Sequence, residues 1–62
     1  MPYIEASFFE DRFTDRQFAA DMVAELTKAV SEVLGDEIGS DTTVVLHGVA
    51  RAQWGHGGKL MG

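Results

Sequence analysis

Apolar side chains alternate along the first segment of the chain, residues 3–9, at the period of two that is typical of a β-strand. One face of such a strand carries Ile4, Ala6 and Phe8, and the other carries Tyr3, Glu5, Ser7 and Phe9. Because both faces hold large apolar groups, the strand needs cover on both sides. A single following helix covers only one of them, so the pattern predicts a further partner for this strand.

The longest periodic segment repeats its apolar residues at the spacing of an α-helix, and we expect that helix to run from about Asp15 to Leu34. Its apolar stripe consists of Phe18, Met22, Leu26, Ala29 and Val33, widened by Ala19, Val23, Val30 and Leu34. Charged residues fall on the other side and predict a solvated face. Thr14 and Gln17 have the spacing of a capping box, and Gly35 is a typical residue to end a helix.

The remainder of the chain predicts a second strand and a hairpin. Residues 36–42 form a polar segment that we interpret as a loop, and residues 43–49 are β-branched and mostly apolar, as in a strand. Residues 50–53 predict a short turn or one turn of helix. The glycine-rich segment 54–62 is typical of a tight hairpin, in which glycines take positive φ. Strand, helix and strand form a β-α-β unit with parallel strands.

Chain length bounds the fold to one domain, residues 1–62. A domain of about 60 residues buries only ~60% of the surface of its unfolded chain, so an isolated protomer is marginally stable. Small folds compensate with disulfides, a metal or oligomerisation. The chain has no cysteine, and His47 and His56 lack the i, i+4 spacing of a zinc pair. We therefore expect no metal site, an interface or structural role for His47, and an oligomer whose copies pair through their strand edges.

Charge and hydropathy exclude two classes of partner. The net charge is −5, and the five basic residues are scattered, whereas a nucleic-acid-binding domain shows a basic patch or stripe. The longest apolar runs are a few residues, far short of the ~20 that span a bilayer. We expect a cytoplasmic protein that binds neither nucleic acid nor membrane.

Candidate chemistry lies at the first two residues, Met1 and Pro2. If Met1 is removed, as is usual before a small second residue, Pro2 carries a free secondary amine. A free α-amine titrates near pH ~8, and burial or a neighbouring cation lowers this pKa toward neutrality. A base is most effective when its pKa lies near the working pH. The alternative interpretation is that Pro2 only precedes the strand and has no chemical role.

Several features of the chain occur in an informative order. Pro2 begins a strand, Arg12 comes just before a capped helix, a second strand follows, and residues 54–58 (Trp-Gly-His-Gly-Gly) close the chain. In this order and within this length, they resemble the small 4-oxalocrotonate tautomerases along the whole sequence. No single feature is specific, and the resemblance depends on all of them together.

The resemblance implies an α+β fold with a β-α-β protomer, parallel strands and a C-terminal hairpin, as in the wider tautomerase superfamily. Two protomers would build a four-stranded sheet, and three such dimers would build a homohexamer in which each hairpin caps a neighbour. The implied activity is a 1,3-keto-enol isomerisation of 2-hydroxymuconate-like dienols or of arylpyruvate enols. No cofactor is expected.

The resemblance also assigns roles residue by residue. Pro2 matches the catalytic base that then acts as the acid, and Arg12 matches the arginine that holds a substrate carboxylate, a role suited to a planar guanidinium. Trp54 matches the aromatic wall of the pocket. Phe9 and His56 match pocket-lining positions that are usually aliphatic, and for His56 an exposed turn residue is an equal alternative.

The sequence departs from the family pattern at Thr43, where the main tautomerases carry a second arginine that binds the substrate carboxylate and carbonyl oxygen. Loss of a comparable donor costs on the order of 10² to 10³ in rate. Three explanations stay open. Arg16, Arg51 or His56 could substitute, the substrate could be a monocarboxylate, or another subunit in a mixed hexamer could supply the arginine.

Two alternative functions follow from this departure and from the chemistry of the superfamily. The chain could be a non-catalytic subunit or the silent partner in a heterohexamer. It could also carry out hydration-type chemistry, such as dehalogenation of a haloacrylate, with a protonated proline and a separate group that activates water. No carboxylate in the sequence clearly fits that second role.

Overall fold

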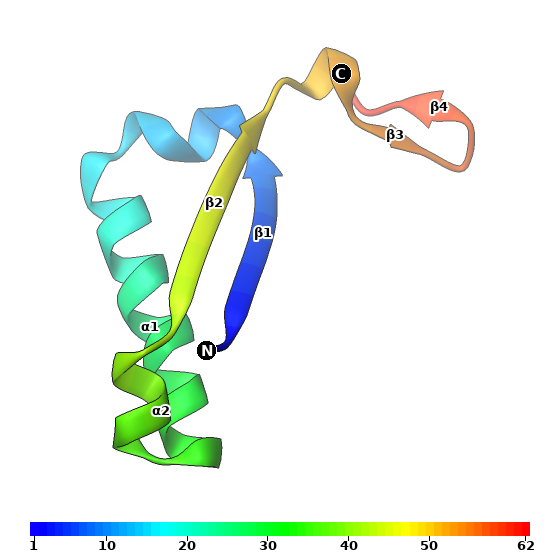
Figure 1. Cartoon of the computed structure of the whole chain (residues 1–62). Coiled ribbons are helices and arrows are strands. Elements are labelled where there is room, and N and C mark those ends of the chain that lie inside the picture. The colour runs from blue at the N-terminus through cyan, green and yellow to red at the C-terminus, as the bar shows by residue number, and fades with distance from the viewer.

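The computed structural model describes the whole chain, residues 1–62. Strand β1 (Tyr3–Phe9) pairs in parallel with β2 (Thr43–Val49), and helix α1 (Arg16–Leu34) connects them along one face of the sheet (Figure 1). The pairing is continuous from Tyr3 opposite Thr43 to Phe9 opposite Val49. The predicted β-α-β unit with parallel strands is therefore confirmed.

Pro2 is fixed to the start of this ladder. The Thr43 N–H donates to the Pro2 carbonyl oxygen over 3.0 Å, one position before the regular pairing begins. Proline has no N–H to donate, so it is tolerated at the first position of a strand. The residue with the candidate amine is thus held by its carbonyl against the opposite strand.

The start of α1 differs from the predicted capping box. A 3₁₀ helix, η1 (Glu10–Thr14), follows β1, and there the Thr14 hydroxyl donates to the Asp11 carbonyl over 2.8 Å. Asp15 is the N-cap instead, and its carboxylate accepts from the Gln17 N–H over 2.9 Å. The prediction of a Thr14 cap was wrong because the 3₁₀ turn already engages that hydroxyl, and aspartate caps a helix as well as threonine does.

Three phenylalanines pack the first half of the chain onto the sheet. Phe18 of α1 meets Phe8 of β1 and Phe13 of η1 in edge-to-face contacts, each with ring centroids 5.2 Å apart. Gly48 of β2 lies beneath the Phe13 ring, since an added Cβ there would be 3.0 Å from Phe13 Cδ2. Phe13, to which the sequence assigned no role, therefore packs η1 onto β2.

Residues 36–42 contain a short helix, α2 (Asp36–Ser40), where a loop was expected. Gly35 ends α1 with φ of 97° and an N–H bond to the Ser31 carbonyl, as predicted for the helix end. Asp36 and Glu37 lie in the first turn of α2, where their negative charges interact favourably with the helix dipole. The polar composition concealed this extra turn because Gly39 and Ser40 are as common in loops as at helix ends.

The C-terminal hairpin is confirmed. A 3₁₀ turn, η2 (Arg51–Gln53), leads into the antiparallel pair β3 (Gly55–His56) and β4 (Lys59–Leu60). Gly57 and Gly58 connect the two strands with φ of 62° and 85°, a conformation that glycine adopts without strain. Figure 1 shows this hairpin projecting away from the sheet and α1.

The protomer has almost no interior. Gly39 is the only buried residue, and no apolar side chain is fully buried. Among the large apolar residues of α1, Val33 is 81% exposed. Neither helix has the length and apolar character needed to cross a membrane.

Substitution of Gly39 by alanine tests the close contact between α1 and α2. An added Cβ would lie 2.8 Å from Ser31 Cβ and 3.0 Å from Ser31 Cα, so the helices must separate. We expect Gly39→Ala to lower the free energy of unfolding by about 1–3 kcal/mol, although helix propensity alone favours alanine over glycine by about 0.5–1 kcal/mol. Urea denaturation at fixed protein concentration measures the change.

Ser31→Ala in the Gly39→Ala background is the matched control. It removes the hydroxyl but leaves Ser31 Cα and a Cβ in place, so it should restore only part of the lost stability. A Gly39→Ala variant as stable as the parent chain would show that α1 and α2 do not pack this closely.

Candidate functional site

The structure divides the six candidate residues between the two ends of the sheet. Pro2 and Thr43 lie together at the end where both strands begin. The other four lie on or after the carboxyl ends of the strands: Phe9, Arg12, Trp54 and His56. The six steps of ~3.3 Å from Tyr3 to Phe9 separate the two ends by about 20 Å. One protomer therefore does not bring Pro2 to the predicted arginine and aromatic wall.

Phe9 and Trp54 meet at the carboxyl end of the sheet. Their ring centroids are 4.5 Å apart, with the planes inclined at 53°. Arg51 joins them, because its guanidinium carbon lies 4.0 Å above the centre of the Phe9 ring. Its Nη2 also donates to Asp11 Oδ2 over 3.1 Å. The result is an aromatic pair covered on one side by an oriented cation.

Arg12 and His56 are not part of this contact. Arg12 lies exposed in η1 and makes no hydrogen bond or ion pair within the chain. His56 is exposed in β3, where its backbone pairs with Lys59. Both side chains are free to reach a ligand or another chain.

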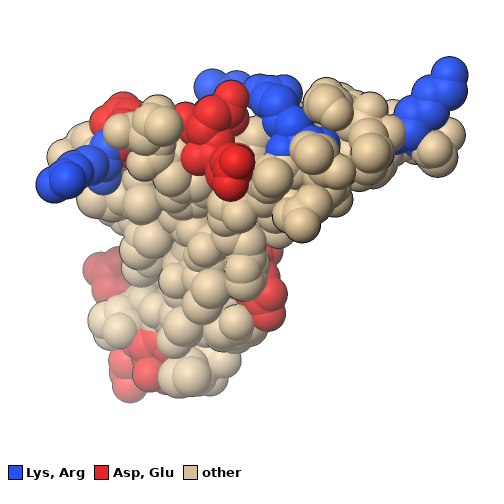
Figure 2. All heavy atoms as spheres, turned by 90° about the horizontal axis from the view of Figure 1, so that it is seen from above, with Lys and Arg blue, Asp and Glu red and all other residues tan.

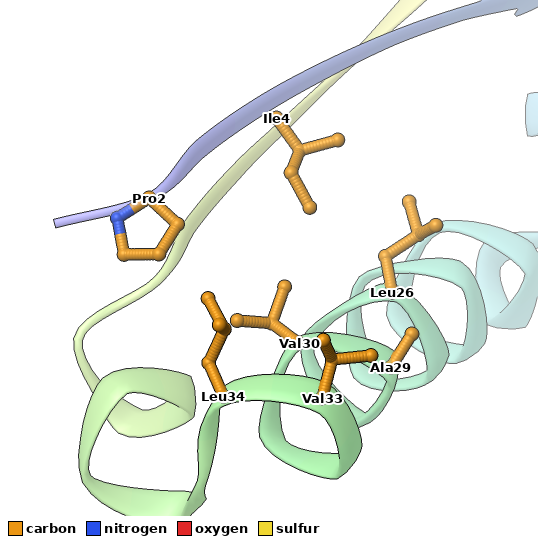
Figure 3. A pocket seen from close by; sticks show the side chains of 7 residues that line it. All are labelled: Pro2, Ile4, Leu26, Ala29, Val30, Val33 and Leu34. Carbon is orange, nitrogen blue, oxygen red and sulfur yellow. The ribbon is translucent and has the colours of Figure 1, made fainter.

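The Pro2 end of the sheet forms one wall of an open apolar groove between β1 and α1. The groove has a volume of ≈ 320 Å³, and its lining residues are Pro2, Ile4, Leu26, Ala29, Val30, Val33 and Leu34 (Figure 3). The proline ring faces aliphatic side chains of α1, and its nitrogen is the only nitrogen among the side chains that line the groove. An amine here would have apolar neighbours that disfavour its charged form.

Met1 and Asp41 lie beside Pro2. With Met1 in place the Pro2 nitrogen is a peptide nitrogen and has no basic lone pair, and the Met1 amine lies 3.9 Å from Asp41 Oδ2. Asp41 is 66% exposed, so solvent screens its carboxylate. Chemistry at this end therefore depends on removal of Met1.

A polar cluster occupies the sheet face opposite α1. His47 Nε2 lies 3.0 Å from Glu5 Oε2, so the imidazole joins β2 to β1, in keeping with the structural role expected for this histidine. Hydrogen bonding from Tyr3, and then from His47, lowers the pKa of Glu5. The same Glu5 contact raises the pKa of Tyr3. No group of three or more His, Cys, Asp or Glu side chains is placed to hold a metal ion.

Comparison with known proteins identifies the family. The family model described as tautomerase enzyme matches residues 2–62. The chain belongs to the tautomerase family. The match begins at Pro2 and includes the hairpin, so the whole β-α-β unit is the tautomerase domain. No curated protein and no solved structure matches the chain.

Family membership supports a tautomerase-type isomerase as the general class of activity. The resemblance noted in the sequence is thus confirmed at the level of the tautomerase family. The contact that sequence reasoning did not single out is the Arg51–Asp11 pair, although Arg51 was one of three possible substitutes for the missing arginine. The topology of this tautomerase could have predicted the pair, because Asp11 and Arg51 each follow the carboxyl end of one of two parallel strands.

The polar cluster predicts a pH-dependent contribution of Glu5 to stability. Because the folded chain lowers the pKa of Glu5 below 4.5, its charged form adds stability above that pH, and the addition is lost as the pH falls through the folded pKa. Glu5→Gln should therefore lower the melting temperature of the tautomerase at pH 7, and the difference should shrink as the pH falls below 4.5.

Glu25→Gln serves as the control, because Glu25 is exposed on α1 and makes no hydrogen bond or ion pair. Its melting temperature should follow that of the parent chain at each pH. A Glu5→Gln difference that stays constant from pH 7 to pH 3 would contradict the coupling of Glu5 to Tyr3 and His47.

Proposed function

We propose that this protein is a 4-oxalocrotonate tautomerase-like isomerase that uses the amine of Pro2, exposed by removal of Met1, as its proton shuttle. Its substrates are 2-hydroxydienoates or enol forms of 2-oxo acids, either 2-hydroxymuconate-like or arylpyruvate. The observation that carries the proposal is the position of Pro2. It is the first residue of the family match, and its ring contains the only nitrogen among the side chains that line the apolar groove.

The proposed reaction needs a neutral amine that takes the enol proton and returns a proton to carbon. The apolar groove favours the neutral amine, while the Asp41 carboxylate at the same end favours the charged form. Asp41 is 66% exposed, so solvent screens its effect on the amine. A base is most effective when its pKa lies close to the working pH, and the proposal requires this of Pro2.

A second copy of the chain completes the proposed site. Pro2 lies at one end of β1, and Phe9 with its neighbouring arginines lies at the other, about 20 Å away. Strands from two protomers that run antiparallel at a shared edge would bring the two ends together. This geometry supports a dimer in which each site draws residues from both chains, and three such dimers would form the homohexamer that the resemblance implies.

The distribution of charge supports the same arrangement. Four of the five basic residues follow the carboxyl ends of the strands: Arg12, Arg16, Arg51 and Lys59. Figure 2 shows Lys and Arg side chains interspersed with Asp and Glu on the nearer part of the molecule, and only acidic and uncharged side chains on the receding part. A carboxylate substrate would find its cations at the carboxyl ends of the strands, whereas Pro2 lies near Asp41. Contact between copies would join the base to the cations.

One observation favours a second candidate function, a non-catalytic partner in a heterohexamer. Thr43, in place of the second arginine, lies beside Pro2 and contributes its N–H to the Pro2 carbonyl without any charge. If that charge is essential, a different short chain must provide it. Co-purification of such a chain would support this function, and a fully active homohexamer would exclude it.

Pro2→Ala tests the proposed mechanism. We expect the ketonisation rate of 2-hydroxymuconate and of enol-phenylpyruvate to fall on the order of 10² to 10⁴, the usual contribution of a positioned acid–base group. Absorbance of the dienol or enol follows the reaction, and intact mass shows that Met1 has been removed from both proteins. The control is the parent sequence with Met1 retained, which should be as inactive as Pro2→Ala. Equal rates for parent and Pro2→Ala would overturn the mechanism.

Val33→Glu tests the proposed assembly. Val33 lines the groove yet is 81% exposed in one protomer, and the proposed assembly would cover it with another copy. We expect a charge there to shift the protein from the hexamer to smaller species in sedimentation velocity. Ala24→Glu adds the same charge nine residues earlier, about 180° around the helix at ~100° per residue, and should leave the hexamer intact. Equal sedimentation of all three proteins would show that the groove is not an interface.

A further inference from the structure

The Arg51 guanidinium is held against the candidate aromatic wall with much of its donor capacity unused. Its carbon lies 4.0 Å above the Phe9 ring, and one N–H bond to Asp11 is the only side-chain hydrogen bond that it makes. A guanidinium has five N–H donors. The side chain is 46% exposed, so the remaining donors face solvent beside Phe9 and Trp54.

We propose that Arg51, at the end of the sheet opposite Thr43, takes over the carboxylate-binding role of the missing arginine in a site that a second copy completes with Pro2, and that Asp11 competes with the substrate for it. This inference rests on the proposed function, because it names the carboxylate-binding residue of that same site. Stacking on Phe9 fixes the plane of the guanidinium, and its free edge suits two parallel bonds to a carboxylate. A conjugated or aromatic substrate body would then lie along Trp54.

The other two possible substitutes lack this arrangement. Arg16 begins α1 and makes no hydrogen bond, ion pair or aromatic contact within the chain. His56 is exposed in the hairpin, likewise without a side-chain partner. Arg51 alone contacts Phe9, which itself contacts Trp54. It is therefore the only one of the three whose orientation is fixed before a ligand arrives.

Asp11 gives the pair two opposed effects on a ligand. It orients Arg51, and it also occupies one donor and cancels the net charge of the pair. Its side chain is 57% exposed, so the ion pair is solvated and opens readily. An incoming carboxylate either displaces Asp11 or shares the guanidinium with it. Affinity for the ligand should then rise when the Asp11 charge is removed.

A purely structural role predicts the opposite sign. If the Arg51–Asp11 pair serves only to hold η2 against η1, loss of either partner loosens the Phe9–Trp54 contact and weakens the binding of any ligand there. Asp11→Asn thus distinguishes the two roles, because it should tighten carboxylate binding in one case and weaken it in the other.

Trp54 provides the measurement, since it is the only tryptophan in the chain and lies on Phe9. The protein is titrated with 3-phenylpropionate and, separately, with the uncharged 3-phenylpropan-1-ol, while the fluorescence of Trp54 is recorded. We expect Arg51→Met to lower the affinity for 3-phenylpropionate about tenfold or more, as for loss of a charged hydrogen-bonding partner. The affinity for the alcohol should not change. Lys28→Met removes one positive charge from the solvated face of α1 and should alter neither affinity.

Asp11→Asn should raise the affinity for 3-phenylpropionate several-fold. Glu10→Gln makes the same change of charge one residue earlier and should leave this affinity unchanged. Arg51→Lys, which keeps the charge without the planar fork, should fall between the parent and Arg51→Met, and it decides the outcome if Arg51→Met fails to fold. Weaker binding in Asp11→Asn, or equal losses for acid and alcohol in Arg51→Met, would overturn the proposal.

The same titration separates this inference from the proposed function. Fluorescence reports binding without turnover, so the Arg51 result does not depend on whether Pro2 acts as the base. If Pro2→Ala retains turnover while Arg51→Met loses carboxylate binding, the mechanism fails and the Arg51 assignment stands. If Pro2→Ala loses turnover while Arg51→Met binds normally, the assignment fails and the mechanism stands.

Discussion

Parallel pairing of β1 with β2 determines where every candidate group lies. In a parallel pair both carboxyl ends are at the same edge, so the segments that follow Phe9 and Val49 must leave the sheet side by side. This brings Asp11 to Arg51 and Phe9 to Trp54 across some forty residues of sequence. The same constraint keeps Pro2 at the far edge. Separation of Pro2 from the arginines at the carboxyl ends is thus a property of the hydrogen-bond ladder and not of any single side chain.

The absence of an interior is the second consequence of so short a chain. Two strands and one long helix enclose only the contacts among Phe8, Phe13 and Phe18 and the approach of Gly39 to Ser31. The groove beside Pro2 and the outer face of the sheet stay open to solvent. A protein of this size gains most of its remaining hydrophobic stabilisation between chains. Surfaces that stabilise the assembly and surfaces that form the proposed site are therefore the same surfaces.

Sequence reasoning succeeded where structure is set locally. The 3.6-residue stripe located α1, the β-branched run located β2, and the Gly57-Gly58 pair located the hairpin turn, since each depends on residues a few positions apart. It failed at the Thr14 cap because neighbouring Asp15 competes for the same position. It also overlooked α2, whose polar residues serve a loop or a helix equally well.

The candidate site was less predictable than the fold. Family resemblance supplied Pro2, Arg12 and Trp54, whose roles stay predictions, and periodicity could not show that Arg51 rests on Phe9 and bonds to Asp11. Those contacts join segments that are distant in sequence, and composition carries no record of them. Phe13 is a similar case. Its ring contacts Phe18 of α1 and also lies against Gly48 of β2, where a larger residue would leave less room.

The bond between Thr43 and the Pro2 carbonyl has a consequence for the entropy of the site. Chain termini usually fray, and a terminal amine samples many orientations. Here the proline ring fixes one backbone angle and the Thr43 N–H fixes the carbonyl, so the residue is immobilised on both sides of its Cα when the sheet forms. Removal of Met1 would change the nitrogen from amide to amine. The ordering of Pro2 is completed during folding and does not have to be repeated at each encounter with a ligand.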